Sequence, residues 1–172
     1  MTLNELRVLL DYHYWARDRA VASAKQLTSE QYTRDMGNSF RSVRDTLVHI
    51  YAADRVWYAR WLGESPRTLI DPESFPDVSS LVEAWEELER RCRSLLDDMG
   101  PDGPDRVMRY TLLSGQQSTG VFWQMLQHVV NHGSYHRGQL TTMLRQLGAP
   151  PPKPMDLVAF YRERQASAAP PA

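Results

Sequence analysis

Apolar residues recur every three or four positions along four stretches of the chain, which is the spacing of helices that bury one face. In the first stretch the repeat begins at Leu6 and Leu9 and continues to Leu27. The pattern predicts four long helices, over residues 3–27, 43–62, 80–99 and about 118–147. Four such helices in one chain predict an all-α fold, a four-helix bundle with a shared apolar core.

Short motifs mark where these helices begin and end. A Ser or Thr followed three residues later by an acid can cap a helix N-terminus, and this pattern occurs at three of the predicted starts. The three capping sequences are Thr2–Glu5, Ser42–Asp45 and Ser80–Glu83, and the fourth helix is expected to start near Ser118 or Thr119. Glycine commonly follows the last turn of a helix. The predicted ends are followed by Gly63, Gly100 and Gly148.

The segments between the helices differ in character. Residues 64–77 contain three prolines and are predicted to form a loop. Residues 105–119 are rich in β-branched and aromatic residues, so the long connection between the third and fourth helices is predicted to be an extended crossover, or a short hairpin that turns near Gly115. Asp156 is expected to cap a short C-terminal helix. The predicted domain spans residues 1–165, and residues 166–172 are expected to form a disordered tail.

Histidines provide the candidate chemistry. His128, His132 and His136 lie four residues apart in the fourth predicted helix, so their side chains share one face with apolar neighbours. Two ligands at positions i and i+4 of a helix can converge on one ion. His49 lies on the apolar face of the second predicted helix. Because facing helices of a bundle bring such side chains together, we predict that His49, His132 and His136 bind one metal ion.

The other two histidines are interpreted differently. A straight helix drifts by about 40° every four residues, so three successive turns rarely point at one ion. We therefore predict that His128 is not bound directly to the metal and either contacts a ligand or belongs to the core. His13 lies alone on the apolar face of the first helix. A hydrogen-bonded core histidine is the favoured interpretation there, because an imidazole is costly to bury without a partner.

Composition and charge argue against several classes of protein, including nucleic-acid-binding, disulfide-bonded and membrane-spanning proteins. The net charge is -1 and no basic stripe is present, so a nucleic-acid partner is not expected. The single cysteine, Cys92, excludes an internal disulfide and a thiolate cluster, and it lies on an apolar helix face. No uncharged apolar run reaches the roughly 18 residues that span a bilayer. Charges at Glu5, Arg7 and Asp11 interrupt the first residues, so no signal peptide is predicted and a cytoplasmic location is expected.

Three sequence segments carry a family resemblance. They are DYHYWARDRAV in the first helix, VRDTLVHIYAADRVW in the second, and QHVVNHGSYHRGQLTTMLRQLG in the fourth, which contains an H-x₃-H-R-G-Q signature. In these segments the chain resembles the DinB-like family, also called DinB/YfiT-like metalloenzymes. The resemblance covers nearly the whole chain. It implies a four-helix bundle in which His49, His132 and His136 hold a divalent metal, and it raises the expectation of a homodimer. The chain departs from the family pattern at His13 and Arg17, where asparagines are usual, which leaves open whether His13 reaches the outer sphere of the metal.

Three protein ligands leave coordination positions open, which is typical of a catalytic metal. Neutral imidazoles suit transition metals, and zinc or nickel is expected. No carboxylate is convincingly placed to bind the ion, since Asp45 serves equally well as a helix cap. The charge of the ion would then be uncompensated, and such a site favours an anionic ligand such as hydroxide or thiolate.

Two functional interpretations stay open. In the first, the protein is an enzyme that activates a low-molecular-weight thiol or water toward a small-molecule substrate, because family members that resemble it include thiol-dependent S-transferases and a mycothiol-dependent isomerase. In the second, it is a non-catalytic, stress-related metal-binding module. Tyr12, His13 and Gln139 are candidate catalytic residues by their positions on apolar faces, and packing is the favoured alternative for each.

Overall fold

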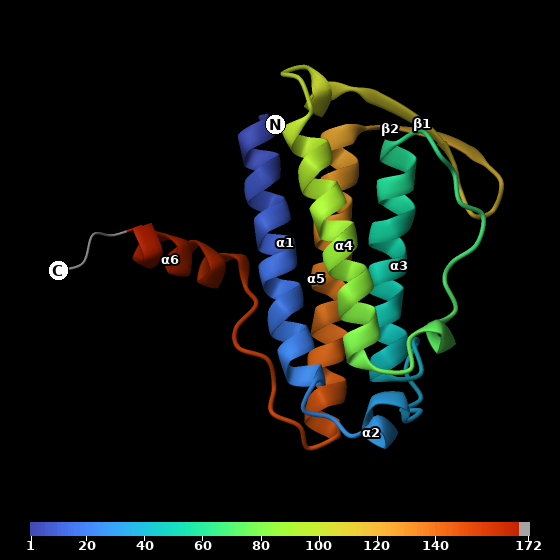
Figure 1. Cartoon of the computed structure of the whole chain (residues 1–172), viewed down its shortest axis with the longest axis vertical. Helices are drawn as coiled ribbons and strands as arrows, with labels where there is room; N and C mark the ends of the chain where they lie inside the picture. Colours follow the sequence, from blue (N-terminus) through green and yellow to red (C-terminus); the bar gives the residue numbers. More distant parts are fainter. Residues whose placement is uncertain (169–172) are drawn as a thin grey trace.

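Four long helices lie side by side in the computed structural model, which describes residues 1–168 (Figure 1). They are α1 (Leu3–Ala24), α3 (Val43–Trp61), α4 (Val78–Asp97) and α5 (Phe122–Gln146). Each lies where the apolar periodicity predicts a helix, with ends shifted by a few residues. Shorter elements join them: the helices α2 (Ser29–Thr33) and α6 (Leu157–Ala168), the 3₁₀ turns η1 (Pro72–Ser74) and η2 (Gly103–Asp105), and one hairpin. The prediction of an all-α fold is therefore correct for the bundle, but the chain as described is mostly helical with a small two-stranded sheet.

The order of the helices around the bundle is not a simple up-and-down one. Helix α1 packs against α4 and α5, and α3 packs against the same two helices. In Figure 1, α1 and α5 run in one direction along the bundle, and α3 and α4 run in the other. Helices α4 and α5 thus occupy opposite corners, and the chain crosses the end of the bundle between them. This is the long crossover that the sequence predicts.

The crossover contains the hairpin that the sequence analysis offered as one alternative. Strand β1 (Val107–Thr111) pairs antiparallel with β2 (Gln117–Val121), with Val107 opposite Val121 and Thr111 opposite Gln117. Gly115 in the turn has a φ of 94°, a conformation that glycine adopts without strain. Because residues 117–121 pair with β1, α5 begins at Phe122, and the predicted start near Ser118 or Thr119 is wrong.

Two other helix starts differ from the predictions. Helix α4 begins two residues early because Asp77, and not Ser80, is the N-cap: its carboxylate accepts the backbone N–H of Ser80 at 2.8 Å. Helix α1 ends at Ala24, and a second capping box formed by Thr28 and Gln31 starts α2. The one-turn length of α2 gives it too little periodicity to be recognised in the apolar pattern.

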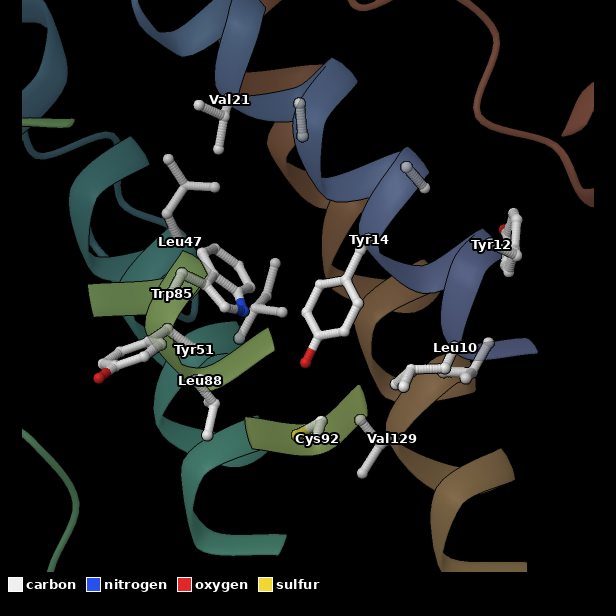
Figure 2. Close-up of a cluster of buried hydrophobic side chains, with 14 of the residues drawn as sticks. Leu10, Tyr12, Tyr14, Val21, Leu47, Tyr51, Trp85, Leu88, Cys92 and Val129 are labelled. Carbon is white, nitrogen blue, oxygen red and sulfur yellow. The ribbon is translucent and has the colours of Figure 1, made fainter. Parts of the chain in front are cut away.

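The core is formed by apolar and aromatic side chains from all four long helices. Trp85 of α4 is 1% exposed and lies in the middle of the cluster in Figure 2, between Tyr14 of α1 on one side and Tyr51 of α3 on the other. Cys92 is also buried in this cluster, which agrees with the interpretation of this residue as core. This packing fixes the helix faces relative to one another and so determines which side chains meet between α3 and α5.

The C-terminal helix α6 lies outside the bundle and begins directly after Asp156, as predicted (Figure 1). Its buried Phe160 packs edge-on against Tyr12 and Trp15 of α1. The helix continues to Ala168, into the segment expected to be a disordered tail, and the rest of that segment lies outside the described residues. Among residues 1–168, no helix combines the length and apolar character needed to cross a bilayer.

Candidate metal centre

Three histidines from two antiparallel helices meet on one side of the bundle. His49 comes from the second turn of α3, and His132 and His136 come from successive turns of α5. One ring nitrogen from each residue lies within 4.8 Å of the other two. The Nε2 atoms of His49 and His132 are 3.0 Å apart, and the ring centroids of His132 and His136 are 4.4 Å apart. The structure thus brings together the three residues that the sequence selected, in a cluster that could hold a metal ion.

The protonation of two of these residues suits metal binding. Burial, together with the neighbouring His136, lowers the pKa of His49 to about 4. Burial likewise lowers the pKa of His132 to about 4, with His136 and His49 as the next causes. Both imidazoles are therefore neutral at pH 7, and a neutral imidazole has the free lone pair that a metal ligand requires.

Gln139 orients the third imidazole. The side-chain oxygen of Gln139 accepts the Nδ1–H of His136 at 2.8 Å, one turn further along α5. With Nδ1 carrying the proton, Nε2 of His136 is the nitrogen with a free lone pair. Gln139 was selected from sequence as a candidate catalytic residue. The structure places it beside the cluster, in a contact that holds His136.

Phe40 covers one side of the histidine cluster. Its ring stacks on His49 with centroids 3.9 Å apart and meets His136 edge-on at 5.2 Å. A mainly apolar cleft of about 330 Å³ opens on one side of Phe40 and includes His49, Val48 and Leu69. A smaller cleft of about 170 Å³ includes Phe40 and Gln139. Phe40 was missed in the sequence because it lies in a loop, where helical periodicity gives no signal.

His13 is separate from the cluster and has its own partner. It is fully buried, and its Nε2–H donates to Oδ2 of Asp54 at 2.9 Å. The indole N–H of Trp85 donates to the same oxygen at 2.9 Å. Asp54 is 3% exposed, so this is a hydrogen-bonded unit inside the core. The contact agrees with the interpretation of His13 as a hydrogen-bonded core histidine, although its Nδ1 is buried without a partner. Asp54 itself was missed, although it lies four residues after Ile50 on the buried face of α3.

Two further candidates also lie outside the cluster. The Tyr12 hydroxyl contacts Ser134 Oγ at 3.2 Å and donates to the backbone oxygen of Met155 at 3.0 Å. His128 is exposed and is not part of the three-residue cluster, so the alternative that it belongs to the core is wrong. Its ring packs edge-on against Trp57 at 5.1 Å. Partial burial lowers the pKa of His128, and the charge of Arg60 lowers it further.

Acidic side chains and the cysteine do not join the cluster within residues 1–168. Asp45 lies in the first turn of α3, where it pairs with Arg44 at 3.0 Å and lines the apolar cleft. Ser42 caps this helix by accepting the backbone N–H of Asp45 at 3.0 Å. Among residues 1–168, the cluster that could hold a metal therefore consists of three imidazoles.

The fold and the cluster define a class: helical bundles with three convergent histidines between two antiparallel helices. The sequence matches the DinB family over residues 1–167, and the chain belongs to that family. The resemblance found in the sequence motifs is thereby confirmed.

Individual relatives support this assignment. The chain is 31% identical over 151 residues to Protein DinB of Bacillus subtilis (strain 168), a match that covers 81% of this chain and 84% of that protein. It is 24% identical over 144 residues to the uncharacterized protein YizA of the same organism, covering 82% and 87% of the two chains. The crystal structure of a DinB-like protein from Bacillus cereus ATCC 10987 has a similar fold, with a TM-score of 0.66, 16% identity, and coverage of 85% of this chain and 95% of that one.

Proposed function

We propose that this chain binds one divalent transition metal ion, zinc or nickel, through His49, His132 and His136, and that the ion activates a small thiol or a water molecule toward a small-molecule substrate. The observation that carries the proposal is the convergence of three imidazole nitrogens within 4.8 Å of one another. Neutral imidazole is a preferred ligand of these metals, whereas calcium and magnesium prefer oxygen.

The spacing of the nitrogens supports this donor set. Two nitrogens at about 2.0–2.1 Å from a tetrahedral zinc ion lie about 3.3 Å apart. The Nε2 atoms of His49 and His132 are already 3.0 Å apart, so a small movement of either ring would fit them to one ion. The hydrogen bond from His136 to Gln139 leaves Nε2 of His136 available as the third donor.

The proposed chemistry follows from the number of protein ligands, because three ligands leave at least one coordination position of the ion open. When bound, such an ion supplies Lewis acidity at an open coordination position and lowers the pKa of a thiol or water molecule. The side chains around the ion position it and form the surface that a substrate would contact. The Phe40 ring covers one face of His49, and the apolar cleft beside His49 offers a surface for the apolar part of a substrate. Three neutral ligands leave the charge of the ion uncompensated, which favours an anionic partner, and sulfur suits zinc and nickel.

A cobalt-substituted protein tests the thiol branch. Adding a small thiol, such as 2-mercaptoethanol, should produce a sulfur-to-cobalt charge-transfer band, and it should raise the unfolding midpoint of the metal-loaded protein only. The matched control is His128→Ala, which removes a histidine from the same helix outside the cluster and should respond like the wild type. If millimolar thiol changes neither the spectrum nor the midpoint, thiol activation is wrong, and water activation or metal binding without catalysis becomes the better account.

A further inference from the structure

A buried carboxylate lies behind the histidine cluster. Asp54 follows His49 by about 1.4 turns of α3. It accepts two hydrogen bonds at one oxygen: Oδ2 receives the N–H groups of His13 and Trp85, each at 2.9 Å. The tryptophan of this unit is labelled in the core in Figure 2. Both donors come from neighbouring helices, α1 and α4, so the carboxylate is fixed from two sides.

The unit also lies against α5 beside His132. A Cβ atom built on Gly133 would be 2.8 Å from Cε1 and 3.1 Å from Nδ1 of His13. Only glycine fits at that position without displacing a neighbour, so the His13 ring packs directly on the turn of α5 that carries His132. On the same side, the built Cβ would be 2.8 Å from Nη1 of the buried Arg137.

Four polar atoms in this region are buried without a partner: Oδ1 of Asp54 and Nδ1 of His132, together with Nδ1 of His13 and Nη1 of Arg137. Oδ1 of Asp54 is an acceptor, and Nδ1 of His132 is a donor whenever Nε2 is the metal-binding nitrogen. Buried polar atoms nearly always have a hydrogen-bond partner, either a protein group or an ordered water. The charge of Asp54 also acts on the pKa of His132: burial is the main cause that lowers it, the other cluster histidines add to this, and the carboxylate opposes them. The two groups are therefore within electrostatic reach.

We propose that Asp54 is the positioning residue of the metal centre: its Oδ1 accepts the Nδ1–H of His132, directly or through one bridging water, and so presents Nε2 of His132 to the ion. His13 and Trp85 hold the carboxylate in place. This inference rests on the proposed metal centre and extends it, because it assigns His132 an orienting partner as Gln139 orients His136. Metal-bound histidines commonly donate their second N–H to a carboxylate or carbonyl group.

The substitution Asp54→Asn separates this role from simple packing. The amide has the same size, and its oxygen must take the Oδ2 position because the Trp85 indole can only donate. The NH₂ group then occupies the Oδ1 position and faces His132 with a donor. His132 is driven to the tautomer with the proton on Nε2, which cannot bind metal until that proton is removed.

Zinc affinity, measured by competition with a chelating indicator, tests the proposal. Asp54→Asn should lose about 10–100-fold in affinity while keeping the wild-type circular dichroism spectrum. The matched control is Asp97→Asn, the same chemical change at an exposed pair with Arg7, which should bind zinc like the wild type. Asp54→Asn with wild-type affinity, alongside loss of binding in His132→Ala, would overturn the positioning role alone. Wild-type affinity in His132→Ala would overturn the metal centre itself.

A measurement on the wild type keeps the proposal testable if Asp54→Asn does not fold. Nitrogen-15 chemical shifts of the metal-free protein report which ring nitrogen of His132 carries the proton. The proposal predicts the Nδ1–H tautomer, with Nε2 accepting from His49. An Nε2–H tautomer would overturn it.

Discussion

His13 and the three clustered histidines are the same residue type in two different environments. His13 is fully buried and donates to a carboxylate that also binds Trp85. The cluster of His49, His132 and His136 lies at the edge of the core beside clefts, and acidic side chains are absent from it among residues 1–168. A buried imidazole with its own acceptor stabilises the fold, whereas imidazoles that face one another leave lone pairs for a ligand. Removing one histidine from each group should therefore change different properties: the response to metal for the cluster, and the stability of the metal-free protein for His13.

Removing a cluster histidine should have an effect that appears only with metal. We expect His132→Ala to abolish the rise in unfolding midpoint that zinc gives the wild type, which is worth about 2.7 kcal/mol when free zinc is 100-fold above Kd. His128→Ala should keep the full rise, because His128 is outside the cluster. Thermal unfolding with and without zinc measures both. A normal zinc response in His132→Ala would remove the distinction between the two groups.

Removing His13 should destabilise the protein without any metal. His13→Ala leaves the Asp54 carboxylate buried with one of its two donors missing, and breaking a buried pair in this way costs about 3–5 kcal/mol. Denaturant unfolding of the metal-free protein measures the loss. His132→Ala under the same conditions should cost less, since His132 is only half-buried and the Asp54 carboxylate keeps both of its donors at Oδ2. Equal losses in the two variants would contradict the comparison.

The pH dependence of the metal-free protein should reveal the cluster. The pKa values of His49 and His132 are about 4 in the folded state and about 6.5 when unfolded. Below pH 6.5 the unfolded chain binds more protons, so stability is complete above that pH and falls as the pH drops toward 4. The full shifts would correspond to about 3 kcal/mol for each histidine, but both rings are only half-buried and solvent screening reduces the total to about 1–3 kcal/mol. Denaturant unfolding at several pH values in the presence of a chelator measures this. His132→Ala should flatten the fall, and an unchanged slope in that variant would show that other groups cause it.

Releasing His136 from its partner should have a smaller effect. Gln139→Ala removes the acceptor that keeps the proton on Nδ1, and losing such a partner costs metal affinity at the lower end of about 10–100-fold. Chelator competition gives the affinity, and Gln139→Glu serves as the control because its carboxylate can still accept the same hydrogen bond. If the alanine variant binds zinc as tightly as the wild type, the contact with His136 has no orienting role.

The sequence predicts the bundle because a helix that buries one face must carry an apolar residue at every third or fourth position. The same reasoning places the three clustered histidines on facing stripes, because i and i+4 neighbours and one residue on an opposing helix are enough to define a site. Asp54 was missed because a charged residue inside a helix is ordinarily assigned to the solvent face. Its spacing from Leu47 and Ile50 does place Asp54 on the buried face of α3. Together with His13 on the buried face of α1, this gives one titratable residue on each of two core-facing helices, and that pattern was the signal available in the sequence.

Other features depend on contacts between residues far apart in the sequence, or on local backbone geometry, and the spacing of apolar residues does not report either. Phe40 stacks on His49 from a loop, and Asp77 replaces Ser80 as a cap because capping depends on backbone geometry at a single residue. The start of α5 is set by pairing between β1 and β2, a long-range interaction that overrides the local signals at Ser118 and Thr119. In each case the outcome is decided by a tertiary neighbour.

X-ray absorption spectroscopy of the zinc-loaded protein tests the central claim most directly, because it reports which atoms surround the ion. The account predicts one zinc per chain with three imidazole nitrogens at about 2.0–2.1 Å and a fourth ligand supplied by solvent or an added thiol. The His132→Ala protein should give no such site. A shell of oxygen atoms alone, or a fourth imidazole that disappears in His128→Ala, would contradict the account.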